Sequence, residues 1–454
     1  MFRQRVSKQE AVHPVEQMLP PGPSTALAIQ HLLAAYASLV VTPMVIAGAL
    51  GWSSSELVFM ISACLVTSGI CTIIQCLGIG VARNHIGIRL PVVQGTTVVA
   101  IPALIMIGSS YGFNAMFGAT IAAGAFTFLI AGYWSQLLRF FPPVVTGTLI
   151  TVLGVSLLPI AAMWMGGGKG PGAQDVAMDD FVLAAFSMIL VATIMMWGKG
   201  ALPRVAILIG LIAGSILAFL MGKISFDGVA SAEWFGIVTP FALGLPEFKL
   251  AAIISMLLAM LVTMIESTGG YIAIGEVCEK QVEPENIAAG LRAEGLGTML
   301  GGIMCSFPYT TYSQNTGVLR VSGVRSRWVV ALCGVFLILL GIFPKLSALA
   351  ACVPLPVLGG ASMVLFGSIA CTGLKILGQV DMDNKSNLLI VSISLGLAML
   401  SITNPIFFNF LPGSLQMLLN NPITLAGVSA LLLNYLFNMF RQSANHGAPL
   451  VADL

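Results

Sequence analysis

Two stretches decide the fold of this chain: RLPVVQGTTVVA (residues 89–100) and SFPYTTYSQNTG (306–317). Each lies in an apolar region and carries a proline, Pro91 or Pro308, among β-branched, aromatic and hydroxyl residues. Proline lacks a backbone donor and such neighbours favour extended backbone, so we expect an extended segment followed by a half-helix in both places. Corresponding broken segments are typical of inverted-repeat transporters, which bind their ligand between half-helix N-termini. Two unrelated kinked helices are the alternative.

Composition places the rest of the chain in a membrane. Of its 454 residues, 57% are hydrophobic and 8% are charged, which is too few charges for a soluble surface. Lipid must therefore cover most of the exterior. The net charge of +2 and the scattered basic residues exclude nucleic acid as a partner. The eight cysteines lack the paired spacing of a zinc site or a disulfide framework, so we expect no metal and no cofactor.

Apolar stretches of the length that crosses a bilayer recur along the whole chain. We expect about fourteen transmembrane segments, all helical apart from the short extended stretches in the third and the tenth. Lys and Arg concentrate on one side if both termini are cytoplasmic, which supports an even number of crossings. The expected segments are 25–50, 55–81, 91–107, 114–136, 143–165, 180–198, 203–222, 249–272, 287–304, 308–323, 328–347, 354–374, 386–402 and 418–440.

The same pattern predicts a division of the chain into two halves. Each half would contain seven segments and would run in the opposite direction through the membrane. The predicted parts are a cytoplasmic lead-in at 1–24, a first repeat at 25–222, an extracellular or periplasmic linker at 223–248, a second repeat at 249–440 and a cytoplasmic tail at 441–454.

Glu266 is the most informative charged residue in an apolar segment. It lies well inside the eighth segment, in LLAMLVTMIESTGGYIAIG, and Gly269 and Gly270 follow it. A carboxylate at this depth costs about 2.5–3.5 kcal/mol on insertion scales. We therefore expect it to face a polar cavity, where it accepts hydrogen bonds from a ligand or carries a proton. A structural carboxylate paired with another helix is the alternative.

Two more titratable residues lie within apolar segments. Glu294 lies early in the ninth segment, among glycines and two residues after Arg292, and it fits either proton coupling or a local ion pair. His31 is the only histidine within an expected segment. Its ordinary pKa allows proton exchange near neutral pH, although a lone histidine in a bundle is often structural.

The tenth segment adds side chains that could bind a ligand. Gln314 and Asn315 follow the extended run and would lie at the start of its half-helix. Glutamine both donates and accepts hydrogen bonds, which suits the edge of a heterocycle, whereas Asn315 is equally suited to capping the helix. Thr96, Thr97 and Val98 of the third segment would face them.

The run QNTGVLRVSG (314–323) resembles the signature of the nucleobase/ascorbate transporter family. Gln314, Asn315, Gly317 and Gly323 match the signature, and Ser322 stands where the family usually has threonine. The resemblance extends over nearly the whole chain. It includes the QH pair at 30–31, GIRLPVVQGTT (87–97), Glu266, LRAEG (291–295) and VPLPVLGGASMVLFG (353–367).

This resemblance implies a fold and a site. The family fold has fourteen segments in two inverted repeats, divided into a core domain and a gate domain, and it is usually dimeric. By resemblance, Glu266 and Gln314 would bind a nucleobase, and backbone groups near Val98 and Ser313 would complete the site. Glu294 stands where purine-transporting members commonly have aspartate, and His31 matches a histidine that supports the site.

The resemblance further implies a bacterial inner-membrane permease. Gln314 resembles members that carry xanthine or urate, so we expect proton symport of a purine base, with the proton as coupling ion and a homodimer as the assembly. A uracil permease, an anion transporter of the same architecture and a sensor remain alternatives. The sequence contains no HExxH, GxSxG or phosphate-loop motif, so we expect neither an enzyme nor an ATP-driven pump.

Overall fold

The computed structural model describes residues 13–80, 85–168, 176–200, 202–404 and 406–440. Nine of the helices in these ranges are long and apolar enough to cross a bilayer. The count becomes ten if α13 (Arg327–Gly341) and α14 (Pro344–Ala351), which meet at an angle of 81°, are taken as one span. The chain is therefore a helical integral membrane protein, as its composition predicted.

Several of the fourteen expected segments correspond to elements that are shorter, bent or less apolar than an ordinary span. These are α3 (Ile101–Tyr111), α11 (Pro284–Ile303), α12 (Ser313–Ser322), the pair α13–α14, and α18 (Pro422–Asn434). Fourteen segments and two repeats therefore stay predictions. Pro344 begins α14 and Pro422 begins α18. Each proline lacks a backbone donor at the break before its helix, which explains why α13–α14 and α17–α18 are not single straight helices.

The contacts between helices divide most of them into two groups. The first group surrounds two short strands and contains α1 (Pro21–Leu50), α2 (Ser54–Leu77), α3, α4 (Phe113–Ile130), α10 (Leu250–Val277), α11, α12, α13 and α14. The second group contains α6 (Pro143–Met165), α7 (Met178–Trp197), α8 (Ala206–Leu220), α15 (Leu355–Leu377), α16 (Lys385–Thr403), α17 (Gly413–Asn420) and α18. Two short helices, α5 (Trp134–Leu137) and α9 (Asp227–Ser231), lie in connections.

Two buried strands pair at the centre of the first group. β1 (Gln94–Thr96) and β2 (Tyr309–Thr311) are antiparallel, with Gln94 opposite Thr311 and Thr96 opposite Tyr309. The pairing joins segments more than two hundred residues apart in sequence. It confirms the expected extended stretches after Pro91 and Pro308.

Each strand leads directly into a half-helix. α3 begins five residues after Thr96, and α12 begins two residues after Thr311. Because the strands are antiparallel, the two helices follow opposite ends of the pair. The first N–H groups of a helix have no partner within the helix and carry a partial positive charge. The centre of the molecule therefore offers two sets of backbone donors.

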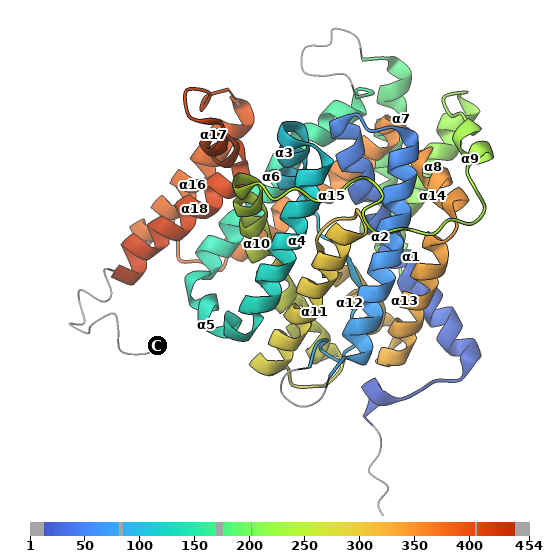
Figure 1. Ribbon diagram of the computed structural model, residues 1–454, viewed down its shortest axis with the longest axis horizontal. Coiled ribbons are helices and arrows are strands. Elements are labelled where there is room, and N and C mark those ends of the chain that lie inside the picture. The colour runs from blue at the N-terminus through green and yellow to red at the C-terminus, as the bar shows by residue number, and fades with distance from the viewer. Residues whose placement is uncertain (1–12, 81–84, 169–175, 201, 405, 441–454) are drawn as a thin grey trace, which may run out of the picture.

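The connection between α9 and α10 crosses the first group (Figure 1). Its N–H groups at Gly236 and Phe241 donate to the carbonyls of Ile342 and Ile303, at the ends of α13 and α11. These carbonyls have no partner within their own helices, so the connection completes their hydrogen bonding. The expected linker at 223–248 is thus attached to the helices that it covers.

Glycines allow α6 and α15 to approach each other closely within the second group. A Cβ atom at Gly373 would overlap the backbone and side chain of Thr151, and one at Gly154 would overlap Ala370. Small residues at such crossings permit dense packing in membranes, where the hydrophobic effect does not drive helices together.

We expect Gly373→Ala to lower the melting temperature of the purified protein, because the new methyl group overlaps the backbone of α6. Overpacking of this kind costs about 1–3 kcal/mol. The matched control is Gly367→Ala on the same helix, where the added atom would meet open space. Equal melting temperatures of the two variants, measured in the same detergent, would contradict this account of the α6–α15 contact.

Candidate substrate-binding site

A small cavity lies between the two helix groups, beside the strand pair. Its volume is about 210 Å³, which is below the range of about 300–1,000 Å³ typical of sites for drug-sized ligands. The first group lines it with Ser38, Thr96, Val98, Val99, Glu266, Thr310, Thr311 and Tyr312, and the second group with Ile150, Leu153, Leu365, Ser368, Ile369 and Thr372. A ligand of this size would touch both groups at once.

The wall formed by the first group is polar. Glu266 reaches the cavity from α10, and Thr310, Thr311 and Thr96 contribute from the strand pair. Glu266 forms no hydrogen bond or ion pair with any other described residue, and its side chain is only partly buried. A carboxylate in this state has oxygen atoms free to accept hydrogen bonds, so the predicted role of Glu266 in ligand binding stays a prediction.

Tyr312 fixes the shape of this polar wall. Its hydroxyl group donates to the carbonyl oxygen of Thr96 at 3.1 Å, so the residue after β2 is tied to the last residue of β1. The tyrosine ring lies where a Cβ atom at position 95 would be, and only glycine leaves room for it. Gln94 adds a second link, since its amide nitrogen donates to Oγ1 of Thr311 at 3.1 Å.

The wall formed by the second group is mainly apolar. Ile150 and Leu153 come from α6, and Leu365 and Ile369 come from α15. The hydroxyl groups of Ser368 and Thr372, also on α15, donate to backbone carbonyls one turn earlier, at 2.7 and 2.9 Å. The apolar residues of this wall could not be singled out from the sequence, because apolar side chains in an apolar helix do not stand out.

Glu294 lies behind the polar wall and does not line the cavity. It is fully buried, and its Oε1 accepts a hydrogen bond of 2.5 Å from the hydroxyl group of Ser267. That hydroxyl group also lies 3.0 Å from Oγ1 of Thr310 and accepts from the backbone N–H of Thr311. Ser267 thus connects Glu294 to β2, and the local ion pair with Arg292 considered from the sequence is not formed.

His31 and Asn315 contact each other and lie outside the cavity lining. The amide nitrogen of Asn315 donates to Nδ1 of His31 at 3.1 Å and to its backbone carbonyl at 2.9 Å. Both residues are buried, and Oδ1 of Asn315 has no hydrogen-bond partner among the described residues. The pair therefore joins α12 to α1, and a ligand role for Asn315 gains no support from this geometry.

The other residues proposed from the sequence have different positions. Val98 lines the cavity, whereas Thr97 is fully buried and its hydroxyl group lies 3.3 Å from that of Thr263 on α10. The backbone of Ser313 and Gln314 forms the first turn of α12, but their side chains lie outside the described part of the chain. The described residues contain no cluster of three or more His, Cys, Asp or Glu suited to a metal ion.

Comparison with known proteins shows to which family this chain belongs. A model described as the permease family matches residues 23–407, which is most of the chain. The chain belongs to this permease family. Members are transporters and not enzymes, so the protein is a permease.

Relatives of the permease are found in several bacteria. It is 40% identical to the uric acid transporter UacT of Escherichia coli, over 97% of this chain and 91% of the relative. It is 39% identical to the nucleobase transporter PlUacP of Paenibacillus larvae, over 92% of this chain and 95% of the relative. Identity to a xanthine permease of Bacillus subtilis is 36%, over 93% and 95%.

Solved structures share the fold of the permease at low sequence identity. The transmembrane domain of the cyanobacterial bicarbonate transporter BicA aligns with a TM-score of 0.59 at 14% identity, covering 90% of this chain and 97% of that domain. Murine Slc26a9, an anion transporter in an inward-facing state, gives a TM-score of 0.59 at 13% identity, and the alignment covers 97% of this chain and 74% of that one. These likenesses concern the fold alone.

We expect Ser267→Ala to destabilise the permease, because it removes the hydrogen bond that Ser267 donates to the buried carboxyl group of Glu294. An unsatisfied buried polar group costs about 1–3 kcal/mol. A double-mutant cycle with Glu294→Gln, followed by thermal unfolding in detergent, measures the coupling between the two side chains. Additive effects would mean that Ser267 does not act on Glu294.

Proposed function

We propose that this permease imports a purine base, xanthine or urate, by proton symport. The observation that carries the proposal is Glu266, a carboxylate without a described partner, in a small cavity between two helix groups. A carboxylate favours ligands with N–H donors. The apolar side chains of Ile150, Leu153 and Ile369 suit the faces of a flat ring, and the hydroxyl groups of Thr310 and Thr311 suit its edge.

The choice of a purine rests on two further points. The relatives that cover most of this chain are named for uric acid, xanthine or nucleobases. In addition, Gln314 stands at the start of α12, where its amide would donate to one ring atom and accept from another. Val98 and Ser313 would contribute backbone groups at the two half-helix N-termini.

The proposed movement is alternating access of one helix group relative to the other. The first group would be the core domain, which binds the base, and the second group the gate domain. The antiparallel strand pair supports fourteen segments in two inverted repeats, because β1–α3 and β2–α12 have the same design and run in opposite directions. Rocking of one group would open the cavity first to one side of the membrane and then to the other.

Glu294 is the proposed proton carrier. It is fully buried, one carboxyl oxygen has no described partner, and no described Lys, Arg or His forms an ion pair with it. Burial of an unpaired charge costs several kcal/mol, so binding and release of a proton there would be coupled to a change of surroundings. Ser267 and Thr310 link this carboxyl group to the strand that lines the cavity. His31, which contacts Asn315, would support the half-helix.

Anion transport by the same architecture is the second candidate function, because solved structures of this fold include bicarbonate and other anion transporters. Glu266 disfavours it, since a carboxylate beside the half-helix N-termini repels anions.

We further propose that the permease acts as a homodimer in the bacterial cytoplasmic membrane, with both termini in the cytoplasm and no cofactor other than the transported proton.

We expect cells that lack their own base permeases to accumulate radiolabelled xanthine or urate when they express this chain, and a protonophore to abolish the accumulation. Glu266→Gln should lower affinity about 10- to 100-fold, because hydrogen bonds to a charged acceptor contribute about 1.5–3 kcal/mol. Hypoxanthine, uracil and bicarbonate are tested in parallel.

The control for this experiment is Glu276→Gln, on the same helix but exposed. It should leave uptake unchanged at equal surface expression. Failure of every base to accumulate above vector controls would refute the proposed function, and saturable bicarbonate uptake in its place would favour the anion transporter. Equal loss of uptake in Glu266→Gln and Glu276→Gln would contradict a binding role for Glu266.

For Glu294, the informative variant is Glu294→Gln, which keeps the size of the side chain but cannot give up a proton. We expect it to retain exchange of external for internal base in vesicles and to lose accumulation driven by a proton gradient. One charge moving through 100 mV supplies about 2.3 kcal/mol, which is the driving force that the variant should no longer use. A parallel decrease of exchange and accumulation would contradict the coupling role.

A further inference from the structure

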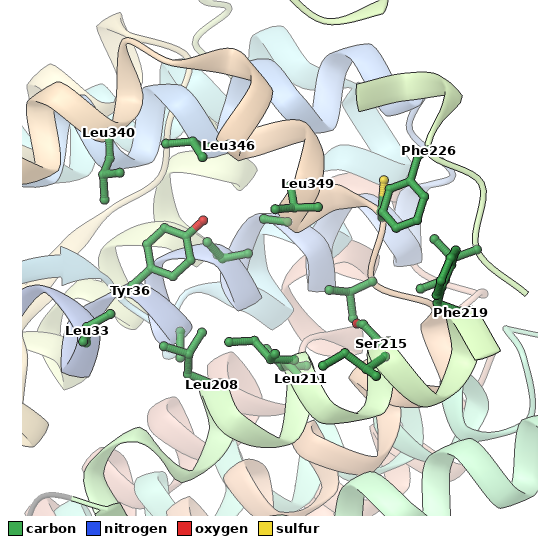
Figure 2. A pocket seen from close by; sticks show the side chains of 18 of the residues that line it. Leu33, Tyr36, Leu208, Leu211, Ser215, Phe219, Phe226, Leu340, Leu346 and Leu349 are labelled. Atoms are coloured by element: carbon green, nitrogen blue, oxygen red, sulfur yellow. The ribbon is translucent and has the colours of Figure 1, made fainter. Parts of the chain in front are cut away.

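A second and larger cavity, of about 500 Å³, lies between the two helix groups, away from the substrate-binding site. Figure 2 shows side chains entering it from four helices. These are Leu33 and Tyr36 of α1, Leu208 and Leu211 of α8, Leu340 of α13, and Leu346 and Leu349 of α14. We call this cavity the lateral groove. It occupies the space where α1 and α8 approach each other over only a short stretch.

The lining of the lateral groove is almost entirely hydrocarbon. Its side-chain heteroatoms belong to Tyr36, Ser215 and Cys352, and the hydroxyl group of Ser215 has no hydrogen-bond partner among the described residues. A water molecule needs two to four polar partners to be held in a cavity. These walls offer too few, so the stable occupant is apolar.

The lateral groove opens toward the side of the molecule. Ile212, Ile216 and Phe219 on α8 line it and are 53%, 56% and 53% exposed. The neighbouring helix α7 continues this apolar surface, with Phe181 and Ile189 also more than half exposed. In a membrane protein such a surface faces lipid, so hydrocarbon chains have direct access to the groove.

One end of the lateral groove has the residues of a membrane interface. Lys345, directly before the lining residue Leu346, places its ammonium group 4.5 Å from the ring centre of Trp234. Tryptophan and lysine gather at the level of the lipid headgroups. The lining on α8 extends from Leu208 to Phe219, eleven residues along the helix, or about 16 Å.

We propose that the lateral groove binds one acyl chain of a membrane phospholipid, with the headgroup near Lys345. Lateral access, the hydrocarbon lining and the cation at one end together match the shape and charge of such a lipid. The chain fills space between α1 and α8, so it stabilises the packing of the two helix groups. This proposal goes beyond base transport and does not depend on the identity of the substrate.

The test uses the full-length chain in vesicles of phosphatidylethanolamine and phosphatidylglycerol that contain a phosphatidylcholine with a diazirine in the middle of one acyl chain. After irradiation, peptide mass spectrometry locates the adducts. We expect adducts on groove residues such as Tyr36 and Leu211 to exceed those on the exposed Ile189 of α7 several-fold. We also expect addition of phosphatidylglycerol to delipidated protein to raise its melting temperature.

Variants test whether the adducts form inside the lateral groove. Ser215→Phe fills the cavity and should remove most of the groove adducts, whereas Ile189→Phe on the outer face of α7 should leave them unchanged. Ser215→Leu, a smaller change, serves the same purpose if the phenylalanine variant does not fold. Adducts spread evenly over the apolar surface, or unchanged in a folded Ser215 variant, would overturn the proposal. Cross-links from the groove to a second copy of the chain, without lipid adducts, would overturn it as well.

Discussion

The pairing of β1 with β2 is the constraint on which the rest of the structure depends. Extended backbone at membrane depth has unpaired N–H and C=O groups, and hydrocarbon offers them no partner. The two strands satisfy this need by bonding to each other, in the register that sets Gln94 against Thr311. Because the strands come from distant parts of the chain, this pairing brings the segments that lead into α3 and α12 together. The candidate cavity lies directly beside the strand pair, which lines it with Thr96, Thr310 and Thr311.

The strand pair also explains why the carboxyl groups of Glu266 and Glu294 have different surroundings. Glu266 and its neighbour Ser267 point to different sides of the polar wall: Glu266 lines the cavity, and Ser267 bonds to Glu294 behind β2. The backbone N–H of Thr311 donates to the same serine hydroxyl group. Ser267 and β2 therefore link Glu294 to the wall of the cavity, although Glu294 does not line the cavity itself.

The central features could be predicted from the sequence because they contrast with their surroundings. Prolines and threonines within apolar regions indicated the strands. The carboxylate of Glu266 within an apolar helix indicated a polar cavity beside it. Other features required the tertiary structure. The bond between Asn315 and His31 joins residues 284 positions apart, and neither residue type specifies the other as its partner. The apolar wall of Ile150, Leu153, Leu365 and Ile369 resembles any lipid-facing surface in sequence, so only packing assigns these residues to the cavity.

The difference between the two walls of the cavity has a consequence for any solute held there. Directional hydrogen bonds come mainly from the first helix group, whereas the second offers mostly dispersion contacts and two hydroxyl groups already bonded to their own helix. Dispersion contacts are weak individually and do not depend strongly on orientation. A solute bound to the polar wall could therefore remain attached while the apolar wall slides past it. Strong hydrogen bonds on both sides would instead resist that movement, because each one would have to break.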